Sequence, residues 1–160
     1  MGPYNPRYNY TFLWEKPEII HRPVVNNKDT LLEAIDNDPK MSKVAALVRK
    51  AGLEKLFDDR QANLSIFLPN DETIPPAVEK YDKYRARIFI YSNLISVRIP
   101  SNRLYKNVLN VYETRDKANE MVIEYKQGKA YVNGHVVIGY TEKQNGILYV
   151  LDGAQIPTFV

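Results

Sequence analysis

Two histidines are the first residues to consider for chemistry, because histidine titrates near neutral pH and can act as a base or a metal ligand. His21 lies in a proline-rich N-terminal stretch, and His135 follows the glycine of a turn-like sequence. Neither has a serine nucleophile and an acid at a spacing typical of hydrolases. The sequence contains no cysteine, which excludes disulfides, thiol catalysis and thiolate metal sites. We interpret both histidines as surface or structural residues, and we expect no enzyme activity, no cofactor and no metal.

Adjacent carboxylates, Asp71 and Glu72, follow an apolar run that ends before Pro69. Such a pair could act as acid and base, or it could bind a cation. Calcium loops place several oxygen ligands at alternating positions, and those ligands are missing here. A carboxylate directly after a strand more often accepts backbone N–H groups of the local turn. The sequence therefore favours a local capping role over a metal site.

The richest basic stretch lies between positions 80 and 106 and is interleaved with tyrosines, a combination that can bind single-stranded nucleic acid. Its members are Lys80, Lys83, Arg85, Arg87, Arg98, Arg103 and Lys106, with Tyr81, Tyr84 and Tyr105 between them. Glu79 and Asp82 dilute this charge, and Tyr84 is expected to share a helix face with Ile88. A solvated helix face is favoured, and nucleic-acid binding is the weaker alternative.

The composition indicates one domain without a strongly charged partner. A chain of 160 residues with 44% hydrophobic residues can bury a core. The net charge of +3, from 22 basic and 19 acidic residues, does not indicate a polyanion as partner. No run of residues is apolar enough for a signal peptide or a membrane span. We expect the protein in the cytoplasm or in a virion, or outside the cell if a signal peptide was removed.

Residues 1–27 are predicted to form an extended N-terminal arm, because prolines recur among aromatic residues without a consistent period of 2 or 3.6. Aromatic side chains are costly to leave in water. The arm is therefore either a strap over its own domain or a hook for another molecule. The candidate partner-binding residues are Tyr4, Tyr8, Tyr10, Phe12 and Trp14. We place the globular domain at residues 28–160.

Helices are predicted in the first half of this domain. Asp29 can act as the N-cap of a first helix, and Gly52 suits the left-handed end of a second helix. A later helix begins at Asp82. The apolar positions at helical spacing are Leu31, Leu32 and Ile35 in the first helix, Met41, Val44, Leu47 and Val48 in the second, and Tyr84, Ile88, Tyr91 and Ile95 in the third.

Strands are predicted mainly in the second half. They cover residues 64–68, 108–112, 121–125, 130–132, 136–140 and 147–151. The last of these is apolar throughout, so we expect it to be a central strand that is buried on both faces. Asn145 and Gly146 form a turn dipeptide before it, and Asp152 ends it. Helices followed by a strand meander predict an α+β domain with a mostly antiparallel sheet.

With these segments in place, residues 28–157 resemble a fasciclin domain. A first signature segment of that family is matched by residues 65–74, where Phe67, Pro69 and Glu72 agree outright. A second is matched near the C-terminus by Asn145, Gly146, Val150, Asp152 and Pro157, with Tyr149 in place of the usual histidine. Asn133 and Gly134 are similar to the turn that precedes this second segment. Where the family often has a tyrosine–histidine pair linked to receptor adhesion, this chain has Tyr91 and Ser92.

The resemblance implies a fasciclin-like β-wedge flanked by several helices, with adhesion or assembly as the usual role and no cofactor. Together with the aromatic arm, it leads to the hypothesis of a non-enzymatic structural module that binds other proteins of a larger assembly. A cementing subunit of a viral capsid, that is, a minor capsid protein, would fit this description. The alternative is an extracellular cell-adhesion domain that binds receptors or glycans. No small-molecule substrate is expected.

Overall fold

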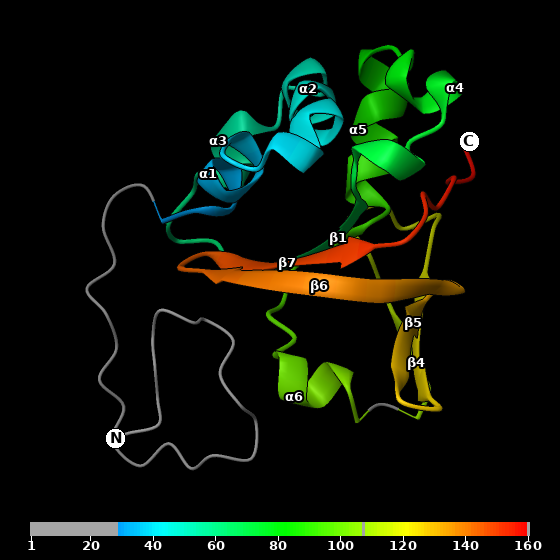
Figure 1. Cartoon of the computed structure of the whole chain (residues 1–160). Coiled ribbons are helices and arrows are strands. Elements are labelled where there is room, and N and C mark those ends of the chain that lie inside the picture. The colour runs from blue at the N-terminus through cyan, green and yellow to red at the C-terminus, as the bar shows by residue number, and fades with distance from the viewer. Residues whose placement is uncertain (1–28, 107, 160) are drawn as a thin grey trace.

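A computed structural model of the chain describes residues 29–106 and 108–159 (Figure 1). The helices are α1 (Leu31–Asp36), η2 (Pro39–Met41), α2 (Ser42–Lys50), α3 (Glu54–Phe57), η3 (Asp71–Thr73), α4 (Pro76–Glu79), α5 (Lys83–Tyr91) and α6 (Ser101–Leu104). None of the helices in this part of the chain is long and apolar enough to cross a membrane.

One seven-stranded sheet forms the centre of the domain, in the order β2-β1-β7-β6-β5-β4-β3. Its strands are β1 (Leu64–Pro69), β2 (Leu94–Ile95), β3 (Asn110–Tyr112), β4 (Met121–Lys126), β5 (Lys129–Val132), β6 (His135–Lys143) and β7 (Gly146–Leu151). The pair of β1 and β7 is parallel, and the other neighbours in this sheet are antiparallel. The predicted α+β fold with a mostly antiparallel sheet and a central β7 is therefore confirmed.

The side chains of β1 and β7 alternate between two separate cores. Ile66, Leu68 and Leu148 pack against the helices α1, α2, α3 and α5 on one side of the sheet. Phe67 and Tyr149 belong to the second core, which also contains residues of α6, β4 and β5. Figure 1 shows the same division, with α1 to α5 above the strands β6 and β7, and α6, β4 and β5 below them. The sheet bends between β6 and β5 and so partly surrounds the second core, which gives the domain its wedge shape.

The first helices agree with the sequence pattern, apart from one cap. The predicted apolar residues of α2 are buried, and Gly52 has the left-handed φ of +73° expected at the helix end. Thr30, not Asp29, is the N-cap of α1, because its hydroxyl oxygen accepts the N–H of Glu33 at 3.4 Å. Asp29 instead forms an ion pair with Lys143 at 3.3 Å.

The predicted face of α5 is wrong. The helix buries Ala86, Phe89 and Ile90, whereas Tyr84 is 54% exposed. The tyrosine spacing was misleading, because a tyrosine can place its ring along the surface and leave its hydroxyl in water. The helix also ends at Tyr91, so that Ile95 lies in β2 and not on the same helix.

Several boundaries differ from the prediction. The short elements β2 and α6 were not predicted, since two and four residues carry almost no periodic signal. Strand β3 begins at Asn110, while Val108 and Leu109 precede it and are exposed. Strand β6 continues to Lys143.

Turn residues connect the meander strands. Asn133 and Gly134 have φ values of +50° and +86°, as expected for a tight hairpin of the mirror-image type. The turn between β6 and β7 lies one residue earlier than predicted, at Gln144 and Asn145, and neither residue has a positive φ. Gly146 is already the first residue of β7, and a Cβ atom at this position would collide with the carbonyl oxygen of Leu64.

We predict that Gly146→Ala destabilises the domain by about 2–3 kcal/mol, because β1 and β7 must move apart to admit the methyl group. Chemical denaturation monitored by circular dichroism measures this loss. Gly139→Ala in the neighbouring β6 is the matched control, since a Cβ there meets nothing within 4 Å. Equal stability of the two variants would contradict the steric explanation.

Candidate functional site

Both signature segments meet in the centre of the sheet. Strands β1 and β7 pair in parallel from Leu64 opposite Gly146 to Pro69 opposite Leu151. The sequence predicts that β1 ends before Pro69, but Pro69 is its last residue. The rings of Phe67 and Tyr149 stack at a centroid distance of 4.9 Å and an interplanar angle of 9°. Both side chains are fully buried. These motif residues hold the domain together and present no surface to a partner.

The side chain of Asn145 connects the turn before β7 to the start of α1 and to the segment that follows α3. Its side-chain oxygen accepts the N–H of Leu31 at 2.9 Å, which is one of the unpaired donors at the start of α1. Its side-chain nitrogen donates to the carbonyl oxygens of Phe57 at 2.9 Å and Asp59 at 3.0 Å. Asn145 is fully buried, so each of these bonds replaces a contact with water. The role of this asparagine is therefore structural.

Tyr149 forms a buried hydrogen bond within the second core. Its hydroxyl donates to the carbonyl oxygen of Ile99 at 2.7 Å. Burial raises the pKa of the Tyr149 hydroxyl strongly above its ordinary value, and the negative charge of Glu142 adds to this effect. The neutral hydroxyl acts as a donor, and a proton-transfer role near neutral pH is not available to it.

The remaining motif residues of the hairpins bind backbone groups. Asp152 accepts the N–H of Val136 at 2.9 Å, which fastens the start of β6 to the end of β7. Asn133 accepts the N–H of Val122 at 2.8 Å and so joins the turn at Gly134 to β4. Pro157, beyond the end of β7, is buried.

Of the two histidines, His135 lies in the described part of the chain. Its Nδ1 lies 3.8 Å from Oδ1 of Asp152, within ion-pair distance if the ring is protonated. In residues 29–106 and 108–159, no group of three or more His, Cys, Asp or Glu side chains could hold a metal ion. His21 and the predicted anchors Tyr4, Tyr8, Tyr10, Phe12 and Trp14 lie outside the described residues.

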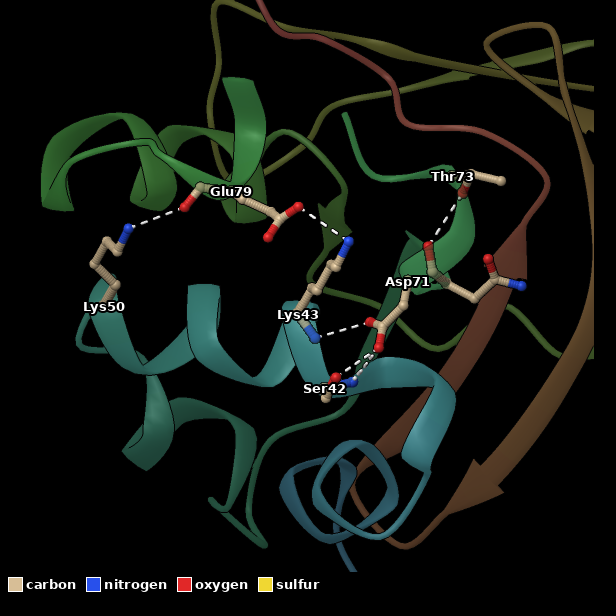
Figure 2. Close-up of polar contacts among 7 residues, drawn as sticks. Ser42, Lys43, Lys50, Asp71, Thr73 and Glu79 are labelled. Carbon is tan, nitrogen blue, oxygen red and sulfur yellow. Dashed lines mark hydrogen bonds and ion pairs between the residues drawn. The ribbon is translucent and has the colours of Figure 1, made fainter. Parts of the chain in front are cut away.

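Asp71 caps a helix, but not the local one that we predicted. Its two carboxylate oxygens accept the N–H of Lys43 at 2.8 Å, the N–H of Ser42 at 3.2 Å and the hydroxyl of Ser42 at 2.5 Å (Figure 2). The carboxylate thus binds the positive N-terminal end of α2 from η3. A distant helix start competes well for a carboxylate, because its first N–H groups have no partner within the helix. Glu72, next to it, is exposed.

The basic stretch is divided among several elements. Arg85 pairs with Asp82 at 3.0 Å, and Arg98 donates to backbone carbonyls near the end of β6. The guanidinium groups of Arg87 and Arg115 both lie over the ring of Tyr91, at 5.8 Å and 6.0 Å from its centroid. Helix α6, which carries Arg103, lies on the other side of the sheet from α5 (Figure 1). These cations do not form a single continuous track for a nucleic-acid backbone.

A hollow on the outer surface of α2 was not recognised from the sequence. It faces α4 and measures about 160 Å³. Its lining residues are Ser42, Lys43, Ala46, Leu47, Lys50 and Glu79. The signal in the sequence was the spacing of Lys43, Ala46 and Lys50, which places them on one helix face.

Comparison with known families decides the family of the chain. Residues 39–157 match the Fasciclin domain family. The chain belongs to the fasciclin domain family. The resemblance inferred from the two signature segments is thereby confirmed, and α1 lies just before the matched residues of the fasciclin domain.

The fold of this fasciclin domain is similar to that of a FAS1 domain pair from the insect cell adhesion molecule fasciclin I. The similarity has a TM-score of 0.65 at 18% sequence identity, and it covers 78% of this chain and 50% of the other. At this identity the likeness shows the fold alone. The chain spans half the length of that solved domain pair. Comparison with curated proteins gave no match.

We predict that Asn145→Ala destabilises the fasciclin domain by about 3 kcal/mol, because the N–H of Leu31 and two carbonyl groups lose a buried partner. The exposed Asn63→Ala is the control and should change stability by less than about 0.5 kcal/mol.

Asn145→Asp keeps the acceptor for Leu31 but directs a carboxylate at two carbonyl oxygens, which raises its pKa in the folded state. The Asp variant should therefore be more stable near pH 4 than at pH 7, as measured by urea denaturation. Stability of the Asp variant that is independent of pH would contradict this geometry.

Tyr149→Phe should cost about 1–2 kcal/mol, because the buried carbonyl of Ile99 loses its donor. The raised pKa means that the wild-type contribution is fully present below about pH 10, where free tyrosine ionises, and declines above it. The difference in melting temperature between wild type and Tyr149→Phe should therefore shrink above pH 10. Tyr140→Phe, in the same aromatic cluster, serves as the control. A difference that grows with pH would show that the hydroxyl is not buried as described.

Proposed function

We propose that this fasciclin domain is a non-enzymatic protein-interaction module and serves as a small structural subunit of a larger assembly, such as a minor capsid protein of a virion. The family match over residues 39–157 supports the interaction role in this proposal, since fasciclin domains are generally interaction and adhesion modules. The burial of Phe67, Asn145 and Tyr149 supports it, because the motif residues build the frame and leave partner contacts to the surface.

The N-terminal arm is our candidate for the main contact. Residues 1–27 carry aromatic side chains that supply a large contact area at a low cost in conformational entropy. The proposed anchors are Tyr4, Tyr8, Tyr10, Phe12 and Trp14. The domain at residues 28–160 then acts as the folded body that the arm attaches to a neighbour.

An exposed apolar strip near β3 supports an interaction role for the body as well. Val108 is 82% exposed, Leu109 55% and Val111 51%. Strand β3 is the last strand of the sheet order, and apolar side chains gathered on a surface favour burial by a partner. The strip would extend the area that an arm-mediated contact covers.

A second candidate function is extracellular adhesion. The fold neighbour from the insect cell adhesion molecule fasciclin I favours it. Binding of the purified protein to cell surfaces or to a glycan array would support this second function.

We predict that a protein reduced to residues 28–160 folds with a melting temperature within about 3 °C of the full chain but no longer enters its assembly. It retains Asp29, Thr30 and Leu31, whose contacts with Lys143, Asp58 and Asn145 close the domain. Calorimetry measures folding, and cross-linking in the native source followed by mass spectrometry measures incorporation.

A full-length variant with serine at the five anchor positions tests the aromatic side chains alone, because it keeps the length and charge of the arm. It should be lost from the assembly like the shortened chain. Incorporation of both proteins at the level of the full chain would overturn the role of the arm.

A further inference from the structure

The hollow at α2 and α4 combines a positive rim with an apolar floor. Lys43 and Lys50 lie on α2 and Glu79 ends α4 (Figure 2), while Ala46 and the almost fully buried Leu47 lie between the two lysines. The six lining side chains carry two positive charges and one negative charge. The hollow therefore favours a ligand with one acidic group and an adjacent apolar group.

The two ammonium groups are compensated unequally. Lys43 Nζ lies 3.0 Å from Glu79 Oε2, and both side chains are more than a third exposed. Lys50 Nζ donates to the backbone carbonyls of Glu79 at 3.2 Å and Tyr81 at 2.7 Å. An ammonium group has three donors, so Lys50 keeps one N–H and its full charge for a further acceptor. A carboxylate that binds beside Lys50 would accept the third N–H of its ammonium group.

Parts of the rim are held by hydrogen bonds within the domain itself. Asp71 holds the backbone of Ser42 and Lys43, and the carbonyls of Glu79 and Tyr81 hold the tip of Lys50. Side chains that are already ordered lose less entropy on binding. This lowers the cost of docking relative to that of free surface lysines.

The size and charge favour a protein segment over other ligands. A volume of about 160 Å³ is below the roughly 300–1,000 Å³ of typical small-molecule sites, but it admits a side chain. Nucleic acid would bring several phosphates, whereas two lysines and one glutamate leave the hollow only a small excess of positive charge for them. The apolar floor of Ala46 and Leu47 also gives a phosphate no favourable contact.

We propose that this hollow docks an acidic segment of a partner protein. A glutamate or aspartate of that segment binds Lys50, and a neighbouring aliphatic side chain packs on Ala46 and Leu47. The inference rests on the proposed interaction function and names the chemistry of one partner segment, at a surface separate from the N-terminal arm.

Binding of a fluorescein-labelled octapeptide with two glutamates, each beside a leucine, tests the proposal by fluorescence anisotropy on the full chain. Lys50→Gln should weaken binding about five-fold, since it removes the uncompensated charge. Ala46→Phe should weaken it by at least the same factor, because the exposed Ala46 admits a ring that fills the hollow and leaves every charge in place. Lys55→Gln, an equal loss of charge at an exposed position of α3, should change the affinity less than about two-fold.

Two further probes separate the ligand classes. A peptide with glutamine in place of glutamate should bind at least about five-fold more weakly. Equal effects of Lys50→Gln and Lys55→Gln, or no effect of Ala46→Phe, would overturn the proposal in favour of unspecific attraction. Tighter binding of a thymidine decanucleotide that depends on Lys50 would overturn it in favour of a phosphate ligand. If the peptide fails while the arm still directs assembly, the docking inference falls and the proposed function stands.

Discussion

The fold depends on one buried amide. Asn145 lies in the turn between β6 and β7, yet its side chain binds the start of α1 and two carbonyls of the segment that leads from α3 to β1. The backbone carbonyl of Asn145 also accepts the N–H of Leu64, the first residue of β1. One residue thus fixes where the helical layer meets the sheet. A buried amide can do this because it offers both donors and an acceptor without a charge that would have to be desolvated.

A second constraint follows from the two central strands. Both β1 and β7 are buried on both faces, so every second side chain serves a different core. The buried Ser65 of β1 also ties the sheet to the segment after β2, because its hydroxyl donates to the carbonyl of Val97 and accepts the N–H of Ile99. The signature residues Phe67 and Tyr149 are the stacked pair of the second core. In this chain the buried residues of the family motif thus mark a packing arrangement, and they present no surface to a partner.

The sequence was sufficient for the class of fold, the central strand and the hairpin turn at Asn133 and Gly134, because these follow from local patterns of apolar residues, asparagine and glycine. The turn before β7 lies one residue earlier than this pattern indicates. It was not sufficient where a residue chooses among distant partners. Asp71 has an ordinary capping signature, but whether it caps η3 or α2 depends on the packing of the two elements. The prediction of the buried face of α5 was wrong for a different reason, since tyrosine at helical spacing is compatible with either a core position or a solvent-exposed one. The spacing of residues on α2 indicates one side of the hollow, but the hollow itself forms only where α2 meets α4.

Parallel pairing of β1 with β7 ties residues 64–69 to residues 146–151. While the ribosome is still making the last strand, β1 can pair only with the two residues of β2, and neither core can close. Until β7 has been synthesised, β1 therefore exposes apolar side chains and the unpaired backbone groups of one edge. Folding is expected to be slow, since the long-range contacts between β1 and β7 must form first. Until β7 pairs with β1, the exposed apolar surface makes the incomplete chain more prone to aggregation than the folded domain.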